Sequence, residues 1–196
     1  ADRLRRYDEA EAAYRRAIEL DSKNATPWNR LGILLEDRLA RYDEAEAAYR
    51  RAIEVDSKYD APWNNLGNLL ADRLARYDEA EAAYRRAVEL DPNDSRPWYN
   101  LGILLADRLR RYDEAEAAYR RAIELDSKYA APWNNLGDLL ANRLARYDEA
   151  EAAYRRAIEL DSKYALPWNN LGDLLANRLA RYDEAEGAYR RAIEID

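Results

Sequence analysis

The sequence has 196 residues, a formal net charge of −7, and no histidine, cysteine, methionine or phenylalanine. The absence of histidine and cysteine excludes disulfides, thiolate catalysis and soft metal sites, so we expect no metal, no cofactor and no enzymatic activity. The acidic balance is unfavourable for binding phosphate backbones, and no apolar run approaches the roughly 18 residues that cross a membrane. We therefore expect neither nucleic acid nor membrane as a partner and, without a signal-peptide pattern, a cytoplasmic location.

A period of 35 residues runs through the whole chain, and one tryptophan, one tyrosine and one glycine keep it in nearly every copy: Trp28, Trp63, Trp98, Trp133 and Trp168; Tyr14, Tyr49, Tyr84, Tyr119, Tyr154 and Tyr189; Gly32, Gly67, Gly102, Gly137 and Gly172. Such a period predicts stacked units that bury their apolar faces against one another instead of in one central core. Residues 113–147 and 148–182 differ only at Ala131 and Leu166, which indicates recent duplication or consensus design.

The predicted elements alternate between two kinds of helix. Residues 1–7 read as the end of a first helix whose start is missing. Second helices are predicted near 8–20, 43–55, 78–90, 113–125, 148–160 and 183–195. First helices are predicted near 27–39, 62–74, 97–109, 132–144 and 167–179, which makes eleven helices in all. We expect a single array over residues 1–196, with a partial repeat at 1–26 and five repeats at 27–61, 62–96, 97–131, 132–166 and 167–196.

The copy that begins at Pro62 shows why two helices are expected. Proline is tolerated in the first turn of a helix, where its missing N–H costs nothing. Trp63, Leu66, Gly67 and Leu70 then follow at the spacing of one helix face. The second helix carries its own apolar stripe, formed by Ala80, Tyr84, Ala87 and Val88. Gly67 and Ala80 are small at places where larger side chains would hold the helices apart, so we interpret these positions as packing residues.

This pattern resembles the tetratricopeptide repeat, whose signature runs Trp, Leu-Gly, a large apolar residue, Ala, an aromatic residue, Ala and Pro. The matching residues of one copy are Trp63, Leu66, Gly67, Leu70, Ala80, Tyr84, Ala87 and Pro92. The resemblance implies an all-α fold, a right-handed α-α superhelix of stacked antiparallel helix hairpins, and a role in protein–protein interaction. Two departures stand out: the unit has 35 residues where the family has about 34, with the extra residue near Ala75, and the final proline is mostly serine.

A second family also has a period of 35 residues, namely the pentatricopeptide repeats that bind RNA. Those repeats lack the Trp and Leu-Gly signature, and RNA-binding proteins usually carry a basic face. In this chain the arginines alternate with glutamates, so we do not expect RNA binding.

Comparison of the copies places their variable residues in one loop and on one face of the first helix. On this face Asn64, Asn68 and Ala71 correspond to Tyr99, Ile103 and Ala106 and then to Asn134, Asp138 and Ala141. The face is expected to point away from the apolar stripe, and the resemblance implies that it lines a concave groove. An asparagine recurs beside it, as Asn65, Asn100, Asn135 and Asn170, and Arg30 interrupts this series.

Amide and carboxylate groups dominate the expected groove. An asparagine side chain both donates and accepts hydrogen bonds, so it can pair with the backbone of an extended peptide, and aspartates favour a basic one. We predict that such a peptide binds to Asn29, Asn64, Asn65, Asn68, Asp72, Tyr99, Asn100, Asp107, Asn134, Asn135, Asp138, Asn142, Asn169, Asn170, Asp173 and Asn177.

One alternative stays open at this point. In this alternative the polar residues are merely solvated, and the chain is a structural or engineered array with no dedicated ligand. Such an array would associate head to tail, because no polar closing helix precedes Asp196 and both ends should expose apolar surface. The family's carboxylate clamp needs basic groove residues, and only Arg30 and Arg96 supply them, so we do not expect that function.

Overall fold

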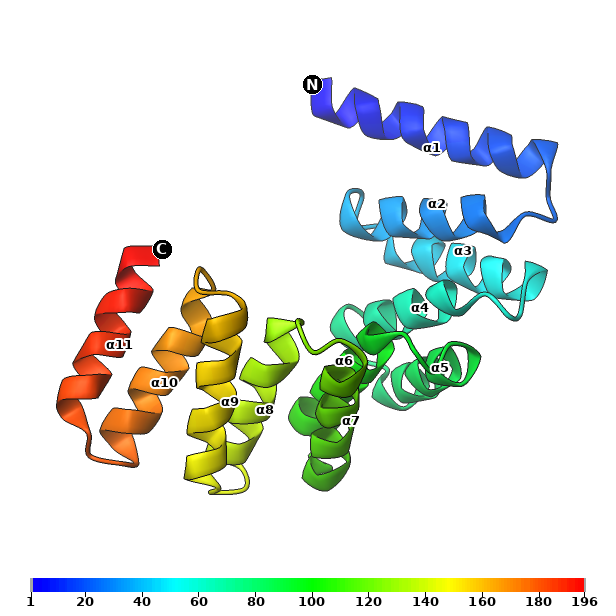
Figure 1. The fold of residues 1–196 in the computed structure, drawn as a ribbon. Coiled ribbons are helices and arrows are strands. Elements are labelled where there is room, and N and C mark those ends of the chain that lie inside the picture. Colours follow the sequence, from blue (N-terminus) through cyan, green and yellow to red (C-terminus); the bar gives the residue numbers. More distant parts are fainter. Residues whose placement is uncertain (1, 196) are drawn as a thin grey trace. The chain divides into compact units, whose positions relative to one another are not determined.

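The computed structural model describes residues 2–195, with side chains from residue 6 to residue 195, and Ala1 and Asp196 lie outside it. This part of the chain is all helical. The elements are α1 (Asp2–Leu20), α2 (Ala25–Asp37), α3 (Tyr42–Val55), α4 (Asp60–Asp72), α5 (Tyr77–Leu90), α6 (Ser95–Ile103), the π-helical turn η1 (Leu104–Arg108), α7 (Tyr112–Leu125), α8 (Ala130–Asn142), α9 (Tyr147–Leu160), α10 (Ala165–Asn177) and α11 (Tyr182–Ile195) (Figure 1). The prediction of eleven helices and of the all-α class is confirmed.

The chain forms two compact units, residues 1–100 and 101–196, and within each unit the helices stack in sequence order. In the first unit α2 pairs with α3 and α4 with α5, while α2 also contacts α4. In the second unit α8 pairs with α9 and α10 with α11, while α8 also contacts α10 (Figure 1). The first helices of adjacent hairpins therefore lie side by side and form one face of each unit.

Each hairpin closes where a glycine of the first helix meets a tyrosine of the second. A Cβ added to Gly67 would lie 2.6 Å from Cε1 of Tyr84. That distance is well inside the 3.5–4.0 Å of an ordinary carbon contact, so only glycine lets the ring lie flat on the helix. Ala80, the small residue on the other helix, is fully buried. The predicted packing role of Gly67 and Ala80 is thus confirmed.

The turn between the two helices of a hairpin takes up the extra residue of the 35-residue unit. The N–H of Leu74 donates to the carbonyl of Leu69 at 3.2 Å, one residue further back than in an α-helix, and the N–H of Arg76 donates to Leu70 at 2.9 Å. Between them Ala75 has a φ of 53°, in the left-handed region. This is a Schellman-like end with alanine where glycine is usual. In the third repeat the wide turn extends over Leu104–Arg108, so the predicted α-helix at 97–109 is interrupted by π geometry.

Two boundaries differ from the sequence-based expectation. The first helices begin and end about two residues earlier than predicted, for example at Asp60 instead of Pro62, because proline is accepted anywhere in the first turn. In addition, α1 is continuous from Asp2 to Leu20, so residues 2–7 do not end a separate first helix.

The second helices of neighbouring repeats are linked by arginine–glutamate bridges. Arg76 donates to Glu79 of its own repeat and to Glu46 of the preceding one, both at 2.7 Å. The same link joins Arg41 to Glu11, Arg146 to Glu116 and Arg181 to Glu151 at 2.6–2.7 Å. The bond from Arg76 lowers the pKa of Glu79 below its ordinary value. These exposed bridges help to align the second helices of neighbouring repeats and contribute only modestly to stability.

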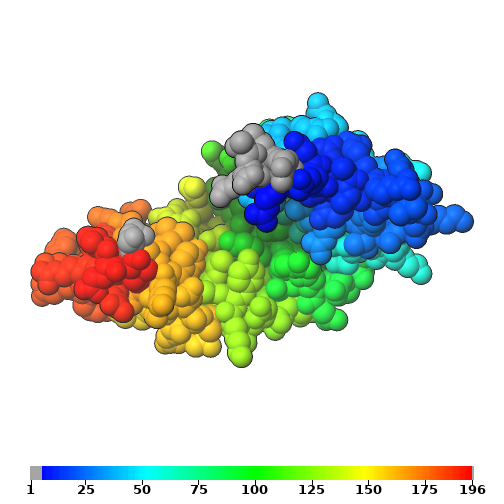
Figure 2. Space-filling view, turned by 90° about the horizontal axis from the view of Figure 1, so that it is seen from above, coloured from blue at the N-terminus to red at the C-terminus, as the bar shows by residue number. Residues whose placement is uncertain are grey.

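Large apolar side chains are exposed near both ends of the described chain. Leu20 at the end of α1 is 73% exposed, and Tyr182 and Ile193 on α11 are 68% and 76% exposed. Figure 2 shows α11, in red, as the outer layer of the second unit. Earlier copies of the two α11 residues, such as Tyr147 and Ile158, are only partly exposed.

Candidate functional site

The recurring asparagines form hydrogen bonds between neighbouring first helices. The side-chain amide of Asn65 donates to the side-chain oxygen of Asn29 at 2.9 Å, and that of Asn100 donates to Asn64 at 3.0 Å. In the second unit Asn170 donates to Asn134 at 3.0 Å. Each such bond joins one repeat to the preceding one, so the ladder holds adjacent first helices in register.

This ladder changes the interpretation of three predicted groove residues. Asn29, Asn64 and Asn134 are only 3%, 9% and 2% exposed, so the expectation that their face points away from the core is wrong for them. Their oxygens accept the ladder bonds, which satisfies polar groups that would be costly to bury alone. Their donors Asn65, Asn100 and Asn170 are half-buried and lie closer to the surface, as does Asn135.

The tyrosine of each second helix reaches the same face with its hydroxyl group. Tyr84 donates to the side-chain oxygen of Asn68 at 2.8 Å, and Tyr189 donates to Asp173 at 2.8 Å. Burial, together with the charges of Asp138 and Asp173, raises the pKa of Tyr154. The phenol therefore stays protonated at neutral pH and remains a hydrogen-bond donor to the groove.

Two cavities open between the first helices of the second unit, and we name each after its tyrosine. The Tyr119 cavity has a volume of about 240 Å³ and is lined by Ala106, Asp107, Tyr119, Asn134, Asn135, Asp138, Leu139, Arg143, Leu166 and Asn170. The Tyr154 cavity has a volume of about 290 Å³ and is lined by Asp138, Ala141, Asn142, Tyr154, Asn170, Asp173, Leu174, Asn177 and Arg178. Both are smaller than typical pockets for drug-sized ligands, and each suits a single side chain.

The second unit thus brings together eight predicted residues around these two cavities: Asp107, Asn134, Asn135, Asp138, Asn142, Asn170, Asp173 and Asn177. Asn169 is half-buried and lines neither cavity. Sequence reasoning missed four polar lining residues, Tyr119, Tyr154, Arg143 and Arg178. The predicted packing role of the tyrosines is confirmed, because Tyr119 and Tyr154 are only 2% and 1% exposed, but their part in the cavity walls was not predicted. The signal that could have revealed it is the polar end of an amphipathic side chain.

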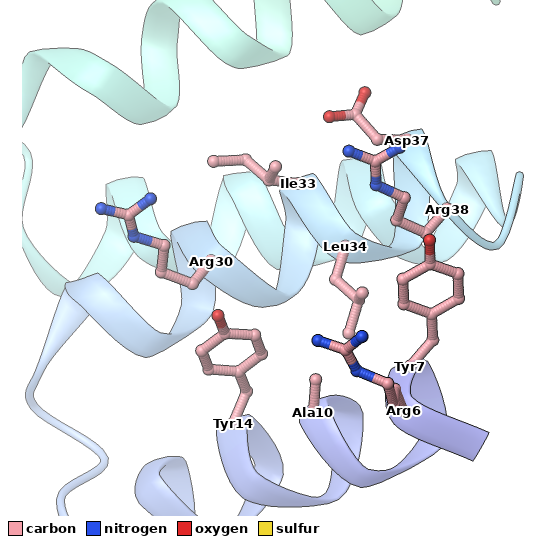
Figure 3. A pocket seen from close by; sticks show the side chains of 9 residues that line it. All are labelled: Arg6, Tyr7, Ala10, Tyr14, Arg30, Ile33, Leu34, Asp37 and Arg38. Atoms are coloured by element: carbon pink, nitrogen blue, oxygen red, sulfur yellow. The ribbon is translucent and has the colours of Figure 1, made fainter. Parts of the chain in front are cut away.

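The first unit holds a cavity of the opposite charge. Figure 3 shows this space of about 420 Å³ between α1 and α2, lined by Arg6, Tyr7, Ala10, Tyr14, Arg30, Ile33, Leu34, Asp37 and Arg38. Three arginines and a single aspartate are among its lining residues. Arg30 occupies the place of the ladder asparagine, and Ile33 that of Asn68 and Asp173. None of the predicted groove residues lines it. In this unit Asn68 is partly exposed, Asp72 is exposed and Tyr99 is half-buried.

The described residues offer neither a metal site nor a membrane-spanning helix. No group of three or more acidic, histidine or cysteine side chains in that part of the chain is placed to hold a metal ion. None of the helices in residues 2–195 is both long and apolar enough to span a membrane.

Comparison with known families and structures agrees with this architecture. A family model described as tetratricopeptide repeat matches residues 1–61, 34–95 and 69–130, and a second model with that description matches 128–196. No protein of curated function matches the sequence significantly.

Among solved structures, YrrB, described as a TPR protein with an unusual peptide-binding site, is 26% identical, with a TM-score of 0.72 over 94% of this chain and 92% of that one. PilF of Pseudomonas aeruginosa is 21% identical, with a TM-score of 0.81 over 95% and 82% of the two chains. MamA of Desulfovibrio magneticus RS-1 is 18% identical, with a TM-score of 0.74 over 87% and 94%. Because the family models together cover the whole sequence and the helices pair as the signature requires, the chain belongs to the tetratricopeptide repeat family.

Proposed function

We propose that the chain is a protein-interaction scaffold, that its repeats work as one array, and that its second unit binds an extended, basic peptide. The observation that carries this proposal is the pair of small cavities whose rims hold Asp107, Asp138 and Asp173. Of the two arginines that line them, Arg143 lies 5.9 Å from the ring centre of Tyr112 and is engaged there. The carboxylates are exposed and so can meet a lysine or arginine side chain.

The amide ladder adds a way to bind the peptide backbone. Asn170 uses one N–H in its bond to Asn134, while its carbonyl oxygen lies outside that bond. An asparagine oxygen can accept a hydrogen bond from a peptide N–H whatever the peptide's side chains are. The family relationship supports a binding role as well, since YrrB is described as having a peptide-binding site. The open cavities and the absence of histidine and cysteine favour binding over catalysis.

Fluorescence polarisation with labelled ten-residue peptides of basic, neutral and acidic composition tests the proposal. The basic peptide should bind most tightly, and binding should weaken as salt is raised from 50 to 500 mM. The double variant Asp138→Asn, Asp173→Asn should weaken binding roughly tenfold, because each lost exposed ion pair contributes up to about 1 kcal/mol.

A matched control removes the same number of charges from another face. Glu124 and Glu159 lie on second helices, are paired with Arg121 and Arg156, and have side chains that are 64% and 63% exposed. The double variant Glu124→Gln, Glu159→Gln should bind the basic peptide as the unmodified protein does. Equal loss in both double variants, or no preference among the three peptides, would refute the proposed groove.

A second candidate function is a structural array that associates end to end without a dedicated ligand. The observation in its favour is the exposed face of α11, with Tyr182 and Ile193. Sedimentation velocity over a hundredfold concentration range distinguishes the two. Association that disappears in the variant Tyr182→Ser, Ile193→Ser supports stacking, whereas a constant monomer rules it out.

A further inference from the structure

The two cavities of the second unit are images of each other, displaced by one repeat. Tyr119, Asn135 and Arg143 of one cavity correspond to Tyr154, Asn170 and Arg178 of the other, each 35 residues later. Asp138 borders both cavities, while Asp107 borders only the first and Asp173 only the second. A ligand that fills both must therefore present the same chemical group twice, at the spacing of the repeats.

The distance between equivalent points is set by helix packing. The helices α8 and α10 are in direct contact, and the bond of 3.0 Å between Asn170 and Asn134 joins them. Helices in such contact have axes about 8–10 Å apart. Two basic side chains of one peptide must match this distance and must also point to the same side of the peptide.

Of the two regular extended conformations of a peptide, only one meets both conditions. In a β-strand, residues i and i+2 face the same way but are about 7 Å apart, residues i and i+4 are about 13 Å apart, and residues i and i+3 point to opposite faces. In a polyproline II helix three residues make one full turn and advance about 9 Å, so residues i and i+3 point the same way. The polyproline II spacing fits the distance between the cavities.

We propose that the second unit recognises a polyproline II segment that carries a basic side chain at every third residue. One basic side chain enters the Tyr119 cavity beside Asp107 and Asp138, and the next enters the Tyr154 cavity beside Asp138 and Asp173. The inference rests on the proposed function, because it specifies the conformation and spacing of the basic peptide. It goes further, because it excludes basic peptides whose charges are two or four residues apart.

Three isomeric hexapeptides of identical composition test the spacing. They are Pro-Lys-Pro-Pro-Lys-Pro, Pro-Pro-Lys-Pro-Lys-Pro and Lys-Pro-Pro-Pro-Lys-Pro, each capped at both ends and labelled with a neutral coumarin. The first, with lysines at i and i+3, should bind about fivefold more tightly than the other two, because it alone fills both cavities. Equal affinities, or a preference for another isomer, would overturn the spacing while leaving the basic-peptide proposal intact.

Single variants show which cavity produces the preference for the hexapeptide with lysines at i and i+3. Asp107→Asn and Asp173→Asn each weaken one cavity, so each should bring the three isomers close to equal affinity. Both changes are compatible with the fold, because the equivalent positions carry Asn142 and Asn68. The control Glu124→Gln should retain the fivefold preference. The inference fails if the preference persists in both aspartate variants, or if no hexapeptide binds while the longer basic peptide does.

Discussion

Replacing Gly137 by alanine should destabilise the protein, whereas the same change at Gly187 should stabilise it. A Cβ at position 137 would lie 2.7 Å from both Cδ1 and Cε1 of Tyr154, and that ring is only 1% exposed. Such overpacking costs about 1–3 kcal/mol. The gain in helix propensity from glycine to alanine returns about 1 kcal/mol, so we expect a net loss of up to about 2 kcal/mol.

Gly187 provides the matched control. It lies on the exposed face of α11, and an added Cβ would meet no atom within 4 Å. Only the difference in helix propensity acts at this position, so Gly187→Ala should raise the free energy of unfolding by about 0.5–1 kcal/mol. The difference between the two variants measures the glycine–tyrosine contact alone.

Urea unfolding followed by circular dichroism at 222 nm gives the two free-energy changes. Because repeat proteins can unfold in segments, hydrogen exchange of the α8 and α9 amides should accompany it, and protection there should fall in Gly137→Ala. If both variants gain stability to the same extent, the packing argument for the conserved period of glycine and tyrosine is refuted.

Three further predictions concern the turns and the ionisable groups. Ala145 has a φ of 54°, in the left-handed region that strains alanine but not glycine, so Ala145→Gly should raise the free energy of unfolding by about 0.5–1 kcal/mol. A urea midpoint lower than that of the unmodified protein would contradict the claim that Ala145 is strained. The pKa of Glu79 is lowered from an ordinary value of 4.5 by its bond from Arg76, so the contribution of this bond to stability is present above pH 4.5 and is lost as the pH falls below that value. Thermal melts from pH 7 to pH 3 should show this decline in stability. The variant Arg76→Gln should show a smaller decline. Burial raises the pKa of Tyr154 above the ordinary 10.0, so its contribution to stability is complete below pH 10 and falls at higher pH as the unfolded phenol ionises. Because the chain has 16 tyrosines and some, such as Tyr182, are exposed, the difference in absorbance at 295 nm between the protein and the variant Tyr154→Phe should be followed. That difference should rise only together with unfolding, and an earlier rise would count against burial.

Much of the fold could be predicted from the period of the sequence. The positions of Trp63, Leu66, Gly67 and Tyr84 follow helix spacing, and that spacing identified both helices of each hairpin and their buried faces. The exact starts of the first helices could not be predicted, because proline is equally acceptable at several positions of the first turn. The left-handed Ala75 was also hidden, since alanine rarely adopts that conformation.

The candidate site could be predicted only in part. Asp138 and Asp173 were identified from the variable face of the first helix, and both line a cavity. The burial of Asn64 was missed because its partner, Asn100, lies in the next repeat, 36 residues away. The basic cavity near Arg30 was missed for a similar reason: Arg6 comes from another helix, and a single sequence does not show which helices meet.

The location of the bound peptide tests the central claim most directly. A basic peptide with a benzophenone next to its lysine can be cross-linked to the protein, which is then digested with trypsin. The fragments 129–143 and 164–178 contain the groove faces of α8 and α10 and differ in mass because Ala131 is replaced by Leu166. We predict that cross-links fall in both fragments. Cross-links confined to second-helix fragments such as 147–155 would contradict the proposed groove.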